Sequence, residues 1–245
     1  MTSALRGHGD IVLAVASSGI ASQLIPGGRT AHSRFSIPLE CNENSTCKIM
    51  QGSELVNLLL HTKLIIWDEA PMTHRLCFEA LDRSLKDICG KDNPECYRKP
   101  FCGKVVVFGG DFRQILSAVP RGSRQDIVLS SLNSSYIWDS CKVLTLTKNM
   151  RLGTGANESE NRAIAEFANW ILKIGDGNIG DMLNDEEKEI NIPNDLLLNN
   201  VADPINFIVE STYPSFIDNY HSHDYIRDRA ILAPTLKMLL RSMNT

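Results

Sequence analysis

The sequence contains few aromatic residues and no long hydrophobic run. Aromatic residues make up 7% of its 245 residues. No apolar stretch approaches the ~20 residues that span a bilayer. Residues 1–10 contain no apolar signal-peptide core, so we expect neither a secretory nor a membrane address. The remaining composition, 43% hydrophobic and 22% charged, is typical of a globular protein with a substantial core.

The seven cysteines include no Cys-x-x-Cys pair, the spacing typical of zinc sites. Their number is odd, and several lie in apolar patterns where a free thiol behaves as a small hydrophobic group. The nearest approach to a metal site is Cys41 and Cys47 with His32 upstream, and it lacks a second ligand pair. We therefore expect a reduced, intracellular protein without zinc.

Three well-known signatures of catalytic loops are also missing. No G-x-G-x-x-G follows a predicted strand, which disfavours a doubly wound enzyme with a dinucleotide or phosphate-bearing substrate. No G-x-S-x-G is present, which disfavours a hydrolase triad. There is no G-x-x-x-x-G-K-[ST], because the two Gly-Lys pairs, Gly90-Lys91 and Gly103-Lys104, are followed by Asp and Val.

The net charge of −4 by itself argues against a nucleic-acid-binding protein, but the charge is unevenly distributed. Residues 61–151 contain 14 lysines and arginines against 10 acidic residues. Residues 152–245 contain 7 lysines and arginines against 15 acidic residues. Any contact with a phosphate backbone is therefore expected to lie in the first part of the chain or to depend on local basic groups.

One apolar run ends in two adjacent carboxylates. Leu64-Ile65-Ile66-Trp67 predicts a strand buried on both faces of a parallel sheet, and Asp68-Glu69-Ala70-Pro71 follows it. Ligands of open α/β sheets bind at the carboxyl ends of strands. There Asp68 could hold Mg²⁺ while Glu69 polarises a water for attack on a phosphate. A solvated acidic turn is the alternative.

Further apolar runs predict the rest of an α/β fold. Together with 64–67, the predicted parallel strands are 11–16, 105–108 and 143–146. Helices are predicted at 53–60, 78–88, 123–132 and 164–174. Each of the four strands ends in glycine or polar residues, which indicates a functional crevice along one edge of the sheet. A glycine-rich hinge at 153–157 and a last strand at 230–233 complete the prediction.

In this order the motifs resemble the PIF (petite integration frequency) family of superfamily-one DNA helicases, in its plant-expanded, Helitron-like branch. The matching stretches span nearly the whole chain. They are Ala16-Ser17-Ser18-Gly19-Ile20-Ala21, Gly27 to Phe35, Ile65 to Met72, Val105 to Gln114, Leu146 to Arg151 and Arg229 to Thr235.

The resemblance implies a RecA-like P-loop NTPase sheet and an ATP-dependent DNA helicase that uses Mg²⁺. Residues 1–151 would form a first RecA-like domain without its phosphate-loop strand, and residues 152–245 the start of a second. Single-stranded DNA and ATP would be the partners, with roles in repair, recombination or telomere maintenance. A nuclear location is implied, and a mitochondrial one stays open.

The resemblance also implies roles for four residues at the nucleotide. Asp68 would face Mg²⁺ and Glu69 would be the base that orients the attacking water. Gln114 would contact the γ-phosphate, and Arg151 would act as an arginine finger. The alternatives are an ordinary helix-start residue for Gln114 and a surface salt bridge for Arg151.

Eight residues are implied as contacts to single-stranded DNA, through backbone N–H groups, guanidinium groups and base stacking. They are Ser17, Ser18, Gly19, Arg29, Thr30, His32, Arg34 and Phe35. His32 could equally be an ordinary loop histidine, and a lone phenylalanine is more often part of a core.

The missing phosphate-binding loop predicts weak nucleotide binding and little catalysis, because backbone N–H groups and a lysine normally cradle the β- and γ-phosphates. We therefore expect a truncated helicase. The alternative is a catalytically inactive protein that keeps a surface for single-stranded DNA or for a partner. Cys102, which stands where the family usually has glycine, is a smaller departure.

Overall fold

The computed structural model describes residues 2–90, 93–150, 152–153, 157–184, 188–197 and 203–231. The chain divides into two compact units, Met1–Asn178 and Ile179–Thr245, called unit 1 and unit 2 below. Over the described ranges, no helix has both the length and the apolar character needed to cross a membrane.

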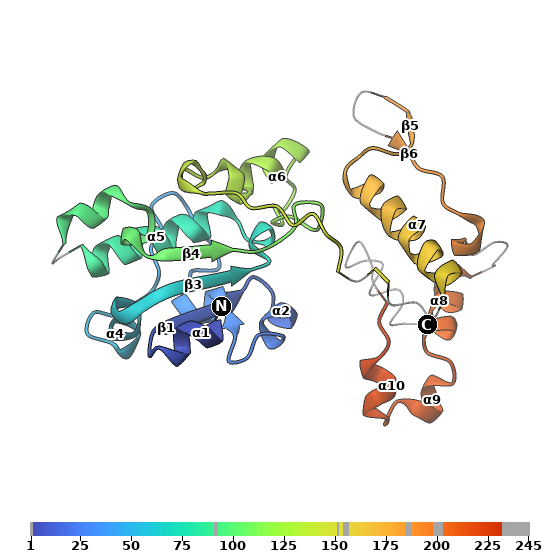
Figure 1. Ribbon diagram of the computed structural model, residues 1–245, viewed down its shortest axis with the longest axis horizontal. Coiled ribbons are helices and arrows are strands. Elements are labelled where there is room, and N and C mark those ends of the chain that lie inside the picture. The colour runs from blue at the N-terminus through green and yellow to red at the C-terminus, as the bar shows by residue number, and fades with distance from the viewer. Residues whose placement is uncertain are drawn as a thin grey trace. The chain divides into compact units, whose positions relative to one another are not determined.

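Unit 1 is built on a four-stranded sheet in which every neighbouring pair is parallel (Figure 1). Its strands, in spatial order, are β2 (Arg29–Thr30), β1 (Ile11–Ala16), β3 (Thr62–Asp68) and β4 (Val105–Phe108). In register, Ala16 lies opposite Asp68, and Trp67 lies opposite Phe108. The carboxyl ends of the three longer strands therefore meet at one edge of the sheet.

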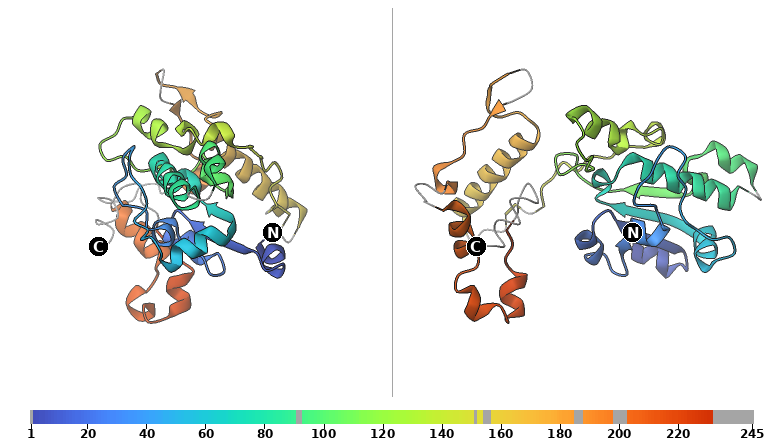
Figure 2. Two further views of the ribbon diagram at one scale, coloured as in Figure 1. Left: turned by 90° about the vertical axis from the view of Figure 1, so that its left-hand side faces the viewer. Right: turned by 180° about the vertical axis from the view of Figure 1, so that it is seen from behind.

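Alternating residues of the strands form one buried core. Val15, Ile65 and Trp67 pack in a single cluster with Phe78 and Leu81 of the covering helix α5. That helix lies over β3 and β4 in Figure 1 and keeps this place when the molecule is turned in Figure 2. Because successive side chains of a strand point to opposite faces, one apolar face is buried under α5.

Unit 1 has seven described α-helices, and all but the first begin after a residue whose side chain caps them. They are α1 (Thr2–Gly7), α2 (Gly19–Gln23), α3 (Ala31–Phe35), α4 (Glu54–His61), α5 (Arg75–Cys89), α6 (Arg124–Ser130) and α7 (Glu158–Gly175). Ser18, Thr30 and Ser53 accept backbone N–H bonds at the starts of α2, α3 and α4. Such caps satisfy N–H groups that the first helical turn leaves without partners.

The predicted α/β class and its strands 11–16, 64–67 and 105–108 are confirmed. The strand predicted at 143–146 is wrong. These residues are irregular, and Val143, Leu144 and Leu146 are 62%, 80% and 98% exposed. A strand needs a hydrogen-bonded neighbour, and among the described residues no strand pairs with the outer edge of β4.

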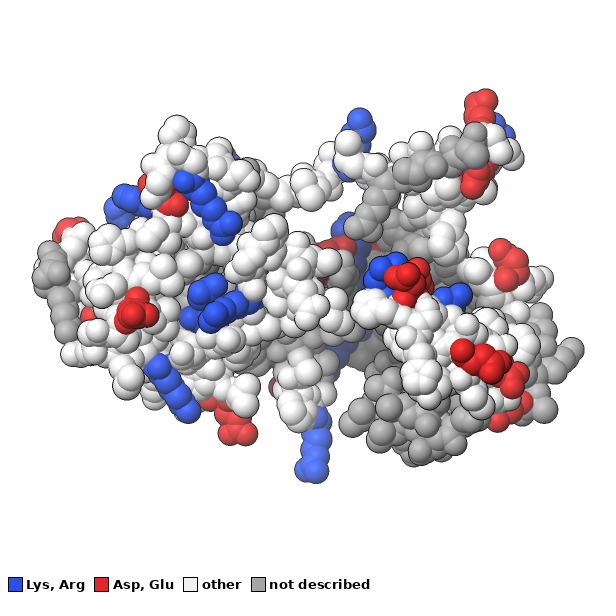
Figure 3. Space-filling model, turned by 90° about the horizontal axis from the view of Figure 1, so that it is seen from below, with Lys and Arg blue, Asp and Glu red and all other residues white. Residues whose placement is uncertain are grey.

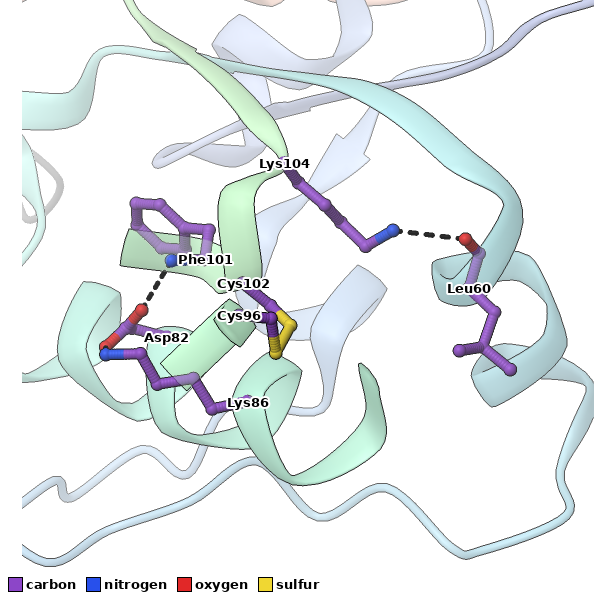
Figure 4. The surroundings of a disulfide bond; sticks show 7 residues. All are labelled: Leu60, Asp82, Lys86, Cys96, Phe101, Cys102 and Lys104. Atoms are coloured by element: carbon purple, nitrogen blue, oxygen red, sulfur yellow. Dashed lines mark hydrogen bonds and ion pairs between the residues drawn. A yellow bond between two sulfur atoms is a disulfide. The ribbon is translucent and has the colours of Figure 1, made fainter. Parts of the chain in front are cut away.

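The loop before β4 corrects the prediction of fully reduced cysteines. Cys96 and Cys102 form a disulfide, and the other five cysteines are free (Figure 4). Phe101, beside Cys102, is buried, and its N–H donates to the Asp82 carboxylate at 2.5 Å. Phe101 and Cys102 both have positive φ, of 52° and 55°, a conformation that favours glycine. This explains why glycine suits position 102.

Among its described residues, unit 2 contains a short antiparallel pair, three α-helices and the 3-10 helix Asn194–Leu196. The pair is β5 (Asp181–Met182) and β6 (Lys188–Glu189). The helices are α8 (Pro204–Thr212), α9 (Phe216–Asn219) and α10 (His223–Arg227). The strand predicted at 230–233 is not formed at Ala230 or Ile231, and its other residues lie outside the described ones. The division at 151/152 into two RecA-like domains stays a prediction.

Candidate functional site

The two carboxylates at the end of β3 lie where a tight turn begins, at the carboxyl edge of the sheet. Asp68 is half-buried, and one of its oxygens, Oδ1, accepts the Glu69 N–H at 3.0 Å. Glu69 has φ 51° and ψ 39°, the left-handed conformation, and the 3-10 helix Ala70–Met72 follows it. The left-handed residue ends the strand abruptly, directly after Asp68, which is the last residue of β3.

The glycine-rich segment that follows β4 packs directly against this turn. After β4, the Gly109 N–H donates to the Trp67 carbonyl, and the Gly109 carbonyl accepts the Ala70 N–H, both at 2.9 Å. A Cβ at Gly110, where φ is 154°, would lie 2.3 Å from Pro71 Cδ. Only glycine permits this approach. The structure therefore brings the predicted segments 68–71 and 109–114 together.

The segment continues through Asp111 to Gln114. The Gln114 N–H donates to the Asp111 carbonyl at 3.1 Å, and its side chain is exposed. Arg113 pairs with Asp111 at 3.4 Å and with Asp176 at 2.5 Å. The hydrogen bond and charge of Asp176 raise the pKa of Arg113. Arg151, the predicted arginine finger, lies outside the described residues.

The residues around Asp68 show whether the protein alone could supply the ligands of the expected Mg²⁺. A Cβ at Gly109 would meet Asp68 Oδ1 at 3.2 Å, so the carboxylate faces the glycine-rich segment. The described residues contain no group of three His, Cys, Asp or Glu side chains able to hold a metal. One carboxylate fits Mg²⁺ only where phosphate oxygens and waters supply the other ligands, which is how Mg²⁺ usually binds.

The first predicted DNA segment, Ser17-Ser18-Gly19, joins β1 to α2. Ser18 caps the helix by accepting the Ala21 N–H at 3.1 Å, and Gly19 is exposed. Ser17 is directed inward. Its N–H donates to the Asp68 carbonyl at 3.0 Å, and its hydroxyl accepts hydrogen bonds from other side chains. The start of this segment is therefore attached to the end of β3.

The second predicted DNA segment carries two arginines. Arg29 is exposed, whereas Arg34 is half-buried, with Nη2 3.5 Å from the Gly27 carbonyl. Arg34 Nε is buried without a hydrogen-bond partner. Burial and the charge of Arg29 lower the pKa of Arg34. Within the part of the chain that the structure describes, neither arginine forms an ion pair with a carboxylate.

The other residues of this segment have structural partners. Thr30 caps α3 by accepting the Ser33 N–H at 3.3 Å. His32 is half-buried with Nε2 3.8 Å from Cys77 Sγ, and burial lowers the pKa of His32. Phe35 is fully buried, with its ring centroid 6.0 Å from that of Trp67. The structure therefore places Phe35 in the core, where its ring has no face open to a base.

Two residues at this edge were not predicted as site residues. The Trp67 Nε1–H donates to the Ser17 hydroxyl at 3.0 Å, and the Thr73 hydroxyl donates to the same oxygen at 2.7 Å. The sequence separations are 50 and 56 residues. The one signal in the sequence was a tryptophan at the end of an apolar strand, whose N–H needs a partner when it is buried.

The surface of unit 1 has no single dominant charge on the side seen in Figure 3. Basic side chains form small separate groups there, with acidic side chains nearby, rather than a continuous stripe. Binding of a phosphate backbone at the two arginines would therefore depend on a few local contacts.

Comparison with known proteins identifies the family. The family model of PIF1-like helicases matches residues 1–185. The chain belongs to the PIF1-like helicase family. Among curated proteins, none matches the chain.

Solved Pif1 structures share the fold. Pif1 from Bacteroides in complex with ADP-AlF3 and ssDNA is 24% identical with a TM-score of 0.54, over 69% of this chain and 37% of that one. A second structure, from work on DNA unwinding at forked dsDNA by two coordinating Pif1 helicases, is 25% identical with a TM-score of 0.56. The match covers 74% of this chain and 41% of that one. Pif1 helicase from Candida albicans is 22% identical with a TM-score of 0.52, over 74% of this chain and 37% of that one.

The chain thus spans about two fifths of the length of the Pif1 structures that it matches. The predicted family is confirmed, as is the parallel α/β sheet that it shares with RecA-like helicases. The Helitron-like branch and the individual site residues stay predictions.

Proposed function

We propose that this chain supplies the carboxylate half of the nucleotide site and a single-stranded-DNA surface of an ATP-dependent PIF1-like DNA helicase. Unwinding by the parent enzyme would serve DNA repair, recombination or telomere maintenance. The location that we propose is a compartment that holds DNA, the nucleus or a mitochondrion. Membership of the helicase family supports the class of activity.

The packing of the turn at Asp68 and Glu69 against Gly109 and Gly110 carries the nucleotide part of the proposal. The two backbone hydrogen bonds of Gly109, to Trp67 and Ala70, hold two loops from neighbouring strands at one sheet edge. The two carboxylates and the loop that carries Gln114 thereby lie at the edge where open α/β sheets bind ligands.

In this proposal each side chain has one task. Asp68 holds Mg²⁺ together with nucleotide phosphate oxygens, and the ion neutralises phosphate charge when it is bound. Glu69 accepts a hydrogen bond from the attacking water and orients it, as a general base does. Gln114, exposed on the adjoining loop, contacts the γ-phosphate, and Arg151 approaches the same phosphate as a finger.

The DNA part of the proposal depends on Arg29 and Arg34. Two guanidinium groups near one another, without a carboxylate partner among the described residues, repel each other. A phosphate between them would remove that repulsion and give Arg34 Nε an acceptor. Ser18, Gly19, Thr30 and His32 lie on the adjoining segments.

These 245 residues contain no G-x-x-x-x-G-K-[ST] motif, which favours a second function, binding of single-stranded DNA without hydrolysis of ATP. Without that loop the chain would bind single-stranded DNA but not turn over ATP. The two functions differ in one measurement, DNA-stimulated release of phosphate from ATP.

The experiment compares this chain with its Glu69→Gln variant in Mg²⁺, ATP and single-stranded DNA. We expect no difference, because the lysine loop is missing. The same pair is then made in a chain extended on its amino side by a segment carrying the loop. There we expect turnover that falls about a hundredfold or more in the variant. Equal turnover in the extended pair would contradict the assignment of Glu69.

DNA binding is measured separately, by the fluorescence anisotropy of a labelled oligothymidylate. Arg29→Ala and Arg34→Ala should each weaken binding and reduce the salt dependence of log K by about 0.7. Arg98→Ala is the matched control, because Arg98 is exposed and pairs locally with Glu95. An equal loss in all three variants would indicate non-specific attraction and contradict the proposed surface.

A further inference from the structure

Ser17 lies at the junction between the first DNA segment and the turn that carries the two carboxylates. Its hydroxyl accepts one hydrogen bond from Trp67 Nε1–H and one from the Thr73 hydroxyl, at 3.0 and 2.7 Å. Trp67 immediately precedes Asp68, and Thr73 follows the 3-10 helix that begins after Glu69. One oxygen therefore contacts both ends of the turn.

The backbone of Ser17 adds a third connection. Its N–H donates to the Asp68 carbonyl at 3.0 Å. A hydroxyl oxygen accepts two hydrogen bonds at most, so the Ser17 oxygen is saturated by Trp67 and Thr73. Ser17, which is half-buried, is thus held by three hydrogen bonds, and its oxygen has no acceptor position left for a ligand, so only its O–H could still donate to one.

Trp67 also contacts the second DNA segment. Its side chain is fully buried and packs against Phe35, the last residue of α3, with ring centroids 6.0 Å apart. The same indole therefore contacts α3 through its ring and Ser17, before α2, through its N–H. Because close-packed interiors transmit small displacements, a shift of either helix reaches Trp67 directly.

We propose that Ser17 is a positioning residue through which single-stranded DNA on α2 and α3 shifts the turn that holds Asp68 and Glu69. This inference rests on the proposed function, since it needs DNA on those helices. It assigns Ser17 a role different from the direct DNA contact expected from the sequence. The Ser17 hydroxyl would relay the position of bound DNA to the carboxylates.

Trp67 is a built-in reporter for this relay, because indole emission responds to the hydrogen bond of its N–H. The full 245-residue chain is made with Trp138→Phe and Trp170→Phe, which removes the other two tryptophans. Oligothymidylate is added to saturation while Trp67 emission is recorded. Binding is followed in parallel by the anisotropy of labelled oligothymidylate.

We expect DNA to change Trp67 emission in this background. Ser17→Ala should lose most of that change while its affinity for DNA stays within about threefold, since Ser17 bonds to Trp67 and Thr73 and not to DNA in this proposal. Arg29→Ala should show the opposite pattern, an affinity about tenfold weaker with a full emission change at saturation. Ser17→Thr keeps the hydroxyl and should restore the response, which a purely structural defect would not explain.

The possible failures are distinguishable. A chain that binds no oligothymidylate overturns both the proposed function and the relay. A chain that binds it with unchanged Trp67 emission overturns the relay alone. A Ser17→Ala variant that loses as much affinity as Arg29→Ala would make Ser17 a direct DNA contact and would also overturn the relay. Thr73→Val, which removes the other hydroxyl at this junction, tests the same connection if Ser17→Ala does not fold.

Discussion

The Tyr136 hydroxyl donates a hydrogen bond of 2.6 Å to the carboxylate of Asp82, a residue with no exposed surface. Asp82 also accepts the Phe101 N–H and pairs with Lys86 at 2.8 Å. A buried carboxylate is tolerated because three donors satisfy it. This one residue of α5 therefore fixes the loop before β4 and the segment after α6.

Replacing Asp82 should be strongly destabilising. Asp82→Ala leaves the Phe101 N–H and Lys86 without their acceptor, so we expect a loss of about 3–5 kcal/mol in the free energy of unfolding. Tyr136→Phe should cost about 1 kcal/mol, since the tyrosine is partly exposed. Urea unfolding measures both. Asp87→Ala, at an exposed position on the same helix, should change stability by less than about 0.5 kcal/mol.

The close approach of Gly110 to Pro71 gives a second prediction. A Cβ at position 110 would lie 2.3 Å from Pro71 Cδ, on a backbone with φ 154°. Gly110→Ala should therefore cost about 3 kcal/mol and displace the turn at Asp68. Gly7→Ala is the matched control, because a Cβ there meets nothing within 4 Å. Equal unfolding midpoints for the two variants would contradict the close packing of these two loops.

The Cys96–Cys102 disulfide closes a short loop, so its contribution should be modest. Cys96→Ser should lower the free energy of unfolding by about 2 kcal/mol, mainly because the unfolded chain gains freedom. Cys102→Gly loses the same bond but relieves the positive φ of 55°, so it should cost about 1 kcal/mol less. Urea unfolding of both variants without reductant tests this order. A larger loss for Cys102→Gly would show that the left-handed backbone costs nothing at this position.

Stability should fall at alkaline pH. Burial raises the pKa of Cys47 from 9.0 to about 11, and burial together with Asp82 raises the pKa of Tyr136 above 10.0. Below about pH 9 these groups keep their protons in both states, and stability is complete. Above it the unfolded chain releases protons first, so stability falls as pH rises. For the buried Cys47 the slope approaches about 1.4 kcal/mol per pH unit until its folded pKa is passed, whereas for Tyr136, which is 48% exposed, screening by solvent makes the slope smaller.

Urea unfolding between about pH 8 and about pH 11 measures this slope. Tyr136→Phe should flatten the part above pH 10, because its phenol no longer titrates. A stability that is constant across this range would contradict the burial of Cys47 and the hydrogen bond between Tyr136 and Asp82.

Strand and helix patterns were readable from the sequence because burial repeats along one element. The runs Ile11–Ala16 and Val105–Phe108 form strands with those bounds, and Ser53 caps α4. The prediction at 143–146 failed although its pattern is equally apolar. Apolar character records a preference for burial, but whether a neighbouring strand is present is a property of the whole fold.

The site was only partly predictable for a similar reason. Adjacent carboxylates at the end of an apolar strand indicated Asp68 and Glu69, and their proximity to the loop after β4 followed from parallel topology. The inward direction of Ser17 could not be predicted, since it depends on Trp67, which lies 50 residues away. For Phe35 the sequence left the core and a base contact as alternatives, and its packing on Trp67 decides for the core. Contacts over such separations leave no local periodicity in the sequence.

The outer edge of β4 has a consequence for handling the protein. Among the described residues no strand covers this edge, and Val105 and Val107 are 59% and 38% exposed. An open edge with apolar side chains is a template for strands of other molecules. Concentrated solutions of the chain should therefore self-associate and lose solubility, and a lysine at Val105 should raise the concentration at which precipitation begins.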